Sequence, residues 1–90
     1  MGAEVRLSGS LIARAGARRA TVPVTDETTV VDVVDRLAET YGPQVRPAIL
    51  EGGRLRSDTV AFRELPTPAE RLAPNSRVRS GDTLRFEVAE

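Results

Sequence analysis

Residues 29–41 read TVVDVVDRLAETY, and this stretch decides the fold because it carries the clearest helical pattern in the chain. Apolar residues recur at i, i+4, i+7 and i+11, the spacing of an amphipathic helix, at Val30, Val34, Leu37 and Tyr41. Thr29 is suited to cap this helix, with Asp32 completing a weak capping box. Gly42 is expected to end it in a left-handed conformation. The stretch therefore predicts one main helix of about three turns.

Two strand patterns precede this helix. Residues 5–7 alternate in polarity, and residues 11–13 are expected to continue that strand. Residues 16–19 read as the turn of a hairpin, with residues 20–24 as its return strand. Pro23 cannot donate a ladder hydrogen bond, so we expect it at a sheet edge or a bulge.

The chain after the helix alternates between turns and strands. In order, the patterns predict a short turn over 47–50, a glycine turn over 51–54, a strand over 59–62, an ordered connection over 65–76 and a strand over 84–88. Pro66, Pro68 and Pro74 forbid long regular structure in the connection, although Pro68 is suited to open one helical turn. In the closing strand, Leu84, Phe86 and Val88 alternate with charged residues, and we expect all three to face the core.

This order of elements predicts the fold. One helix between two pairs of strands is best buried across one face of a mixed sheet of four to five strands. The first and last strands are then parallel neighbours, which is the β-grasp (ubiquitin-like) α+β arrangement. A ferredoxin-like fold needs a second full-length helix, for which the three prolines leave little room. We expect a single domain over residues 1–90.

Composition excludes several functions. The 13 basic residues are all arginine and are balanced by 13 acids, so the formal charge is zero and gives no overall attraction to nucleic acid or to a membrane. The sequence contains no His, Cys or Lys, which removes the usual general base, thiolate, amine nucleophile and zinc ligands. We therefore expect no enzymatic activity and no catalytic, cofactor-binding or metal-binding residues. The sequence has no signal-like or membrane-spanning run, and a cytoplasmic location is expected.

The aromatic residues are few, and we assign them to the core. Phe86 lies on the apolar face of the closing strand and Tyr41 on the apolar stripe of the helix, while Phe62 ends the strand at 59–62. A platform for stacking bases needs exposed aromatics interleaved with basic residues. The sequence therefore predicts no nucleic-acid partner.

Several segments together resemble a known family. These are VRLSGSL at residues 5–11, GARR at 16–19, the helix opening TVVDVVDRL at 29–37, and Gly81-Asp82 before an apolar strand. They are similar to the MoaD/ThiS family of ubiquitin-like sulfur carriers, which includes the small subunit of molybdopterin synthase and the thiamine-pathway carrier. The resemblance is poor between Ser57 and Ser76, where the Asn-Gly turn common in the family is missing.

The resemblance implies a function located at the carboxyl end of the chain. In that family an E1-like activating enzyme uses ATP to adenylate the carboxylate of a terminal Gly-Gly, and sulfur then replaces the adenylate to give a thiocarboxylate. Here the corresponding stretch reads Val88-Ala89-Glu90, so no residue carries over to that role. A terminal glutamate would also have to lose water to enter an apolar channel.

The preferred interpretation is therefore a non-catalytic partner or small subunit of a larger enzyme. Its docking surface is expected on the exposed sheet face and the closing strand, with Arg85, Glu87 and Glu90 pointing outward. One alternative is a sulfur carrier with a modified or incompletely represented tail, serving molybdopterin, thiamine or another sulfur-containing metabolite. A third possibility is a domain cut from a longer polypeptide.

Overall fold

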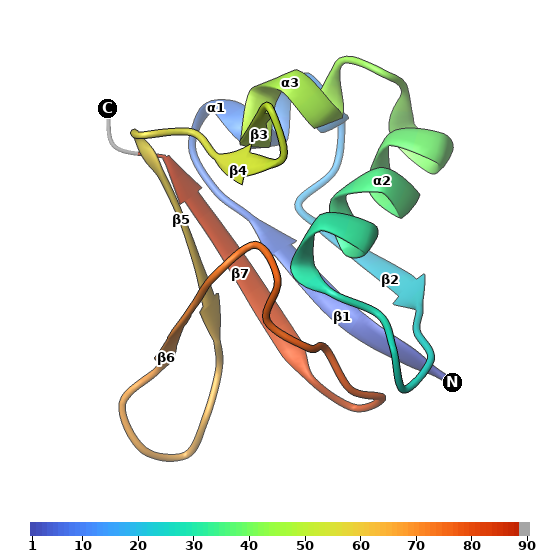
Figure 1. The fold of residues 1–90 in the computed structure, drawn as a ribbon. Helices are drawn as coiled ribbons and strands as arrows, with labels where there is room; N and C mark the ends of the chain where they lie inside the picture. The colour runs from blue at the N-terminus through green and yellow to red at the C-terminus, as the bar shows by residue number, and fades with distance from the viewer. Residues whose placement is uncertain (89–90) are drawn as a thin grey trace.

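The computed structural model describes residues 1–88, in which helices gather over one side of a twisted sheet (Figure 1). In chain order the elements are β1 (Gly2–Leu7), α1 (Ser10–Ala15), β2 (Arg19–Pro23), α2 (Val30–Tyr41), α3 (Val45–Ile49), β3 (Leu50–Glu51), β4 (Arg54–Leu55), β5 (Thr59–Arg63), β6 (Glu70–Leu72) and β7 (Thr83–Val88). None of the helices among the described residues has the length and apolar character needed to cross a bilayer.

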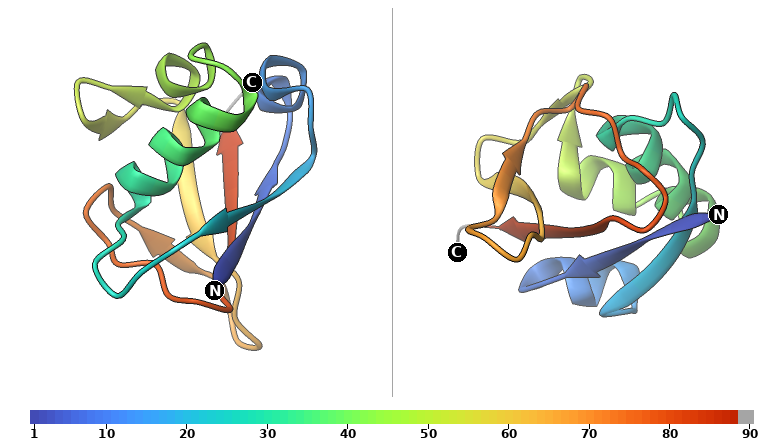
Figure 2. Two further views of the ribbon diagram at one scale, coloured as in Figure 1. Left: turned by 90° about the vertical axis from the view of Figure 1, so that its right-hand side faces the viewer. Right: turned by 90° about the horizontal axis from the view of Figure 1, so that it is seen from below.

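Among residues 1–88, five strands form the main sheet in the order β2-β1-β7-β5-β6, and β3 pairs with β4 in a small separate hairpin. β1 and β7 are parallel neighbours, whereas the other neighbouring pairs of the main sheet are antiparallel. The further views in Figure 2 show α2 running across one side of these strands. The predicted β-grasp fold is therefore confirmed. Pro23 lies in β2, an edge strand, as expected.

The predicted strand over residues 11–13 is wrong, because these residues belong to helix α1. Gly9, with a φ of 59°, turns the chain out of β1, and Gly16, with a φ of 75°, ends the helix in the left-handed conformation. Leu11 and Ala15 are four residues apart and both are buried, so a single helical turn places both side chains in the core. Residues 16–19, predicted to form a hairpin turn, therefore include the C-cap of this helix, Gly16.

The capped start of α2 is confirmed, and the capping box is complete. The amide of Asp32 donates to Thr29 Oγ1 at 3.4 Å, and the amide of Thr29 donates to Asp32 Oδ2 at 3.0 Å. Gly42 ends the helix with a positive φ of 118°, but its ψ of 154° lies outside the left-handed helical region expected for it.

The proline-rich connection is ordered and covers the start of α2. The amide of Val30 donates to the carbonyl of Ser76 at 3.0 Å, and the amide of Val31 donates to the carbonyl of Pro74 at 3.1 Å. These two helix-terminal amides would otherwise lack a partner within the helix. The helical turn expected at Pro68 is not formed, and the short strand β6 follows it instead. Of the turn expected over 47–50, residues 47–49 are the end of helix α3 and Leu50 begins β3.

The core lies between α2 and the sheet. Leu84 and Phe86 are fully buried from the central strand β7, opposite the buried side chains of α2. Tyr41 packs against the edge of this core. The assignment of Phe62 to the core is wrong, because its strand neighbour Ala61 takes the inward position and Phe62 faces the other side of the sheet.

Candidate functional site

Strand β7 divides its side chains between the two faces of the sheet. Leu84 and Phe86 point inward, so Arg85 and Glu87 point to the outer face, where their side chains are 35% and 42% exposed. The sequence predicted this outward placement for both residues. Glu90, the third predicted docking residue, lies outside the described residues.

Strand register aligns further residues with Arg85 on the outer face. Arg6 pairs with Arg85 across β1 and β7 and with Arg19 across β1 and β2. Phe62 pairs with Arg85 across β5 and β7 and with Arg71 across β5 and β6. Directly paired residues share a face, so one line crosses all five strands in the order Arg19, Arg6, Arg85, Phe62, Arg71. We call these five residues the arginine row.

Arg85, in the middle of the row, is held by three neighbours. Its guanidinium carbon lies 5.1 Å from the centroid of the Phe62 ring, within the range of a cation–π contact. Its Nη1 is 3.1 Å from Glu64 Oε1, and its Nε is 3.4 Å from Glu87 Oε1. The Nε atom is buried without a hydrogen bond among the described residues, so the Glu87 contact is an ion pair without hydrogen-bond alignment. These contacts restrict where the guanidinium can point.

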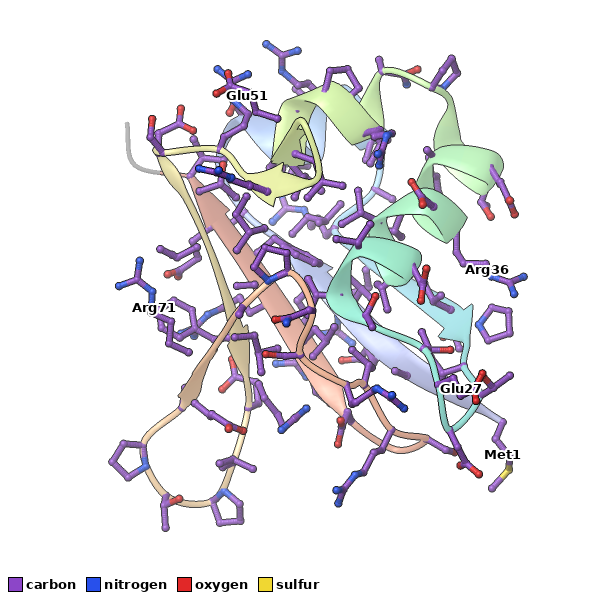
Figure 3. All side chains as sticks on the ribbon, in the orientation of Figure 1. Met1, Glu27, Arg36, Glu51 and Arg71 are labelled. Carbon is purple, nitrogen blue, oxygen red and sulfur yellow. The ribbon has the colours of Figure 1, made fainter. Side chains whose placement is uncertain are left out.

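Among the described residues, the two end members of the row lack such partners, whereas the second member, Arg6, has one. Arg6 forms an ion pair of 2.8 Å with Glu4 on the same strand. Arg19 and Arg71 are exposed, and neither has an ion pair with any residue in the part of the chain that the structure describes. Figure 3 shows Arg71 extending from one side of the molecule, while Arg36 and Glu27 extend from the other. Two guanidinium groups are thus available to a partner.

A shallow groove of about 460 Å³ lies where β7 ends. The groove lies between the turn after β1, the start of β5 with the turn before it, and the end of β7. Its lining consists of Ser8, Gly9, Ser57, Asp58, Val60, Glu87 and Val88. Ser8 Oγ donates a hydrogen bond of 3.1 Å to the carbonyl of Phe86, which fixes the turn after β1 against the end of β7. The groove therefore borders Val88, the last residue that the structure describes.

The opposite side of the molecule carries acidic side chains. An open groove of about 500 Å³ runs along α2 and the loop before it, and is lined by Thr25, Glu27, Thr28, Asp32, Asp35, Arg36 and Glu39. Asp35 is already paired with Arg46 at 2.7 Å, and Asp32 is used in the helix cap. No group of three or more Asp, Glu, His or Cys residues within 1–88 is arranged to hold a metal ion. We therefore assign no chemistry to this groove.

Sequence reasoning missed four members of the arginine row. Arg6, Arg19, Phe62 and Arg71 lie on four different strands, and only the register of those strands brings them into line. Alternation within each strand could have placed Arg6 and Arg19 on an outer face. No local signal could have shown that they sit beside Arg85.

The class of fold follows from this arrangement. A mixed sheet with parallel first and last strands, crossed by one main helix, defines the β-grasp, ubiquitin-like fold. No family model matches the sequence, and no curated protein matches it either. Solved structures do match it.

Three of these solved structures show which kinds of protein are similar to this chain in fold. Small archaeal modifier protein 1 (SAMP1) from Haloferax volcanii is 24% identical, with a TM-score of 0.84 and coverage of 100% of this chain and 97% of that one. CysO in the Amycolatopsis orientalis BexX/CysO complex is 15% identical, with a TM-score of 0.82 and coverage of 98% and 96%. A Pyrococcus furiosus protein described as a molybdopterin converting factor subunit 1 is 10% identical, with a TM-score of 0.74 and coverage of 100% and 99%. The resemblance to the MoaD/ThiS carriers is thus confirmed at the level of the fold.

Proposed function

We propose that this protein is a non-catalytic, ubiquitin-like docking protein that binds a larger enzyme through the outer face of its sheet. The observation that carries the proposal is the arginine row, which lines up four arginines and a half-buried phenylalanine on a face that no helix of residues 1–88 covers, with an exposed guanidinium group at each end. Aromatic and arginine side chains are the residue types most enriched at the energetic centres of protein interfaces.

The shared fold supports a partner of this kind. CysO was solved in a complex with BexX, and the Pyrococcus furiosus protein is described as one subunit of a converting factor. Both descriptions apply to those proteins, and they make a larger enzyme the first partner to test here. The lack of His, Cys and Lys in the 90 residues agrees with a role without side-chain catalysis. The single-domain organisation and the cytoplasmic location stay predictions.

Site-specific photo-cross-linking in the organism that encodes the protein tests the docking face. A p-benzoylphenylalanine in place of Glu87 reports on the outer sheet face, and the same group in place of the exposed Glu39 reports on α2. We expect one enzyme to be captured from position 87 and not from position 39, and the purified enzyme to bind the unmodified protein. Capture of the same enzyme only from position 39 would place the interface on the helix and contradict the proposal.

A second candidate is a sulfur carrier that is activated at its C-terminal carboxylate by an E1-like enzyme. The open groove beside Val88 favours it, because Val88 is the last described residue and the groove provides free space next to it. The test is intact-mass measurement of the natural protein after incubation with ATP and an activating enzyme. A mass gain matching adenylate, or matching sulfur in place of oxygen, supports the carrier role. Carriers of this kind serve the synthesis of molybdopterin or thiamine. An unchanged mass removes it.

A further inference from the structure

We propose that the arginine row binds an extended acidic segment of the partner, which crosses the strands of the sheet. This inference rests on the proposed docking function and names the chemistry of the partner surface. It is carried by the register that places four arginines and one phenylalanine in a line. Arg19 and Arg71, at its two ends, have no ion-pair partner within residues 1–88.

The geometry of the row sets the length of the segment. Neighbouring strands are about 4.8 Å apart, so the four intervals from Arg19 to Arg71 span about 19 Å. An extended chain rises about 3.3 Å per residue, so roughly six residues of a partner cover the row. Alternate side chains of such a segment point to the same side, which brings about three carboxylates over the guanidinium groups.

The residues of the row match carboxylates in particular. Guanidinium groups donate two parallel hydrogen bonds to a carboxylate, and they are weakly hydrated compared with an ammonium group. Arg85 is already oriented by Glu64, Glu87 and the Phe62 ring, so part of the ordering cost is met before binding. Like charges on paired strands also repel one another. A bound acidic segment relieves that repulsion between Arg6 and Arg19.

An acidic polypeptide fits this face better than a nucleic acid does. Glu4, Glu64 and Glu87 lie on the same face as the row, in the positions flanking it, so they would repel any negative charge that is not placed directly over an arginine. Base stacking requires an aromatic ring with an open face, and the Phe62 ring carries the Arg85 guanidinium. A polypeptide can place its carboxylates opposite individual arginines, whereas the phosphate charge of a nucleic acid is continuous.

The test is an NMR titration of the ¹⁵N-labelled protein with an acetylated and amidated peptide of four Glu-Thr repeats. We expect saturable shifts in the arginine Nε–H signals of Arg19 and Arg71 and in the amides of β1, β5 and β7, with a dissociation constant on the order of 1 mM. The matching peptide of four Gln-Thr repeats should give no saturable shift. Binding should weaken as added salt shortens the Debye length from about 30 Å at 0.01 M to about 8 Å at 0.15 M.

Two double variants separate the row from net charge. R19Q/R71Q should weaken binding of the acidic peptide about tenfold, since each exposed ion pair contributes a factor of a few. R54Q/R79Q removes the same charge from two other exposed arginines and should leave the affinity within about twofold of the unchanged protein. Because all four side chains are exposed, both variants should fold, and their amide spectra check this.

Three outcomes overturn the inference. One is the absence of saturable shifts with the acidic peptide up to about 10 mM. Another is an equal loss of affinity in both double variants, which would show a diffuse charge effect. The third is tighter binding of an eight-residue oligothymidine than of the peptide at the same row. Any of these leaves the cross-linking result at Glu87 unaffected, so failure of the acidic segment and failure of the docking function are distinguishable.

Discussion

Phe62 and Phe86 show how one strand position decides the role of a side chain. They lie on neighbouring strands, where Phe86 pairs with Ala61 and Phe62 pairs with Arg85. Phe86 is fully buried in the core, whereas Phe62 is half-buried on the outer face beneath a guanidinium. The apolar character of the two residues is the same, and only the side of the sheet differs.

The two phenylalanines should therefore respond differently to truncation. Phe86→Ala opens a cavity in the core and should lower the free energy of unfolding by about 3–5 kcal/mol. Phe62→Ala removes a half-exposed ring and should cost less than about 1.5 kcal/mol, most of it lost contact with Arg85. Urea denaturation followed by circular dichroism measures both values. Equal losses for the two variants would contradict the assigned faces.

Arg63 is the arginine whose role is structural. Its side chain is 19% exposed, and it contacts Asp82 at 3.1 Å and Glu70 at 2.6 Å as well as the carbonyl of Arg77. Asp82 also accepts the amide of Arg79 at 2.9 Å. This network joins β5, β6 and the turn before β7, so Gly81-Asp82 is more than the turn that the sequence indicated.

Removing Arg63 should therefore be more costly than removing an exposed arginine. Arg63→Gln leaves the 20% exposed Asp82 without its main cation and should lower the free energy of unfolding by about 1–3 kcal/mol. Arg46→Gln breaks a pair of 2.7 Å with Asp35, but both side chains are nearly half exposed, so the cost should be below about 0.5 kcal/mol. Thermal melts of both variants provide the comparison. A larger loss for Arg46 would show that the Arg63 network contributes little.

At the scale of elements, the sequence predicted a helix or strand correctly where all the residues that define it lie within one segment of the chain. The start of α2 is encoded by Thr29 and Asp32 together with the apolar spacing that follows, and all of these lie within one segment. Helix α1 was missed because six residues are too few to show a helical period, and the flanking Gly9 and Gly16 read equally well as turn residues. Pro74 and Ser76, whose carbonyls accept hydrogen bonds from the start of α2, lie more than 40 positions away from the amides that they bind.

The cap of α2 offers a test at this scale. Thr29→Ala removes the side-chain oxygen that accepts the amide of Asp32, and it should lower the free energy of unfolding by about 1 kcal/mol. Thr40→Ala, at an exposed position near the other end of the helix, should be neutral or slightly stabilising because alanine has the higher helix propensity. Chemical denaturation of both variants checks the pair. A loss at Thr40 as large as that at Thr29 would show that the cap is not the cause.

At the scale of the whole molecule, the topology could be predicted but the candidate site could not. The order of elements and the handedness rules leave few arrangements for one helix and two strand pairs, and the β-grasp is one of them. The arginine row depends instead on the register of four strand pairs, and a shift of one residue in any of them would break the line. Among the described residues, the predicted docking surface includes only Arg85 and Glu87, because their own strand alternates clearly and no local pattern links the other members of the row to it.

The central claim is that the outer face of the sheet is the surface that meets the partner. Cross-saturation NMR on the complex with the enzyme captured by cross-linking tests it most directly. The methyl groups of Val60 and Thr83, on strands β5 and β7 of the outer face, should lose intensity, while those of Val31 and Thr40 on α2 keep theirs. Loss of intensity confined to Val31 and Thr40 would contradict the claim.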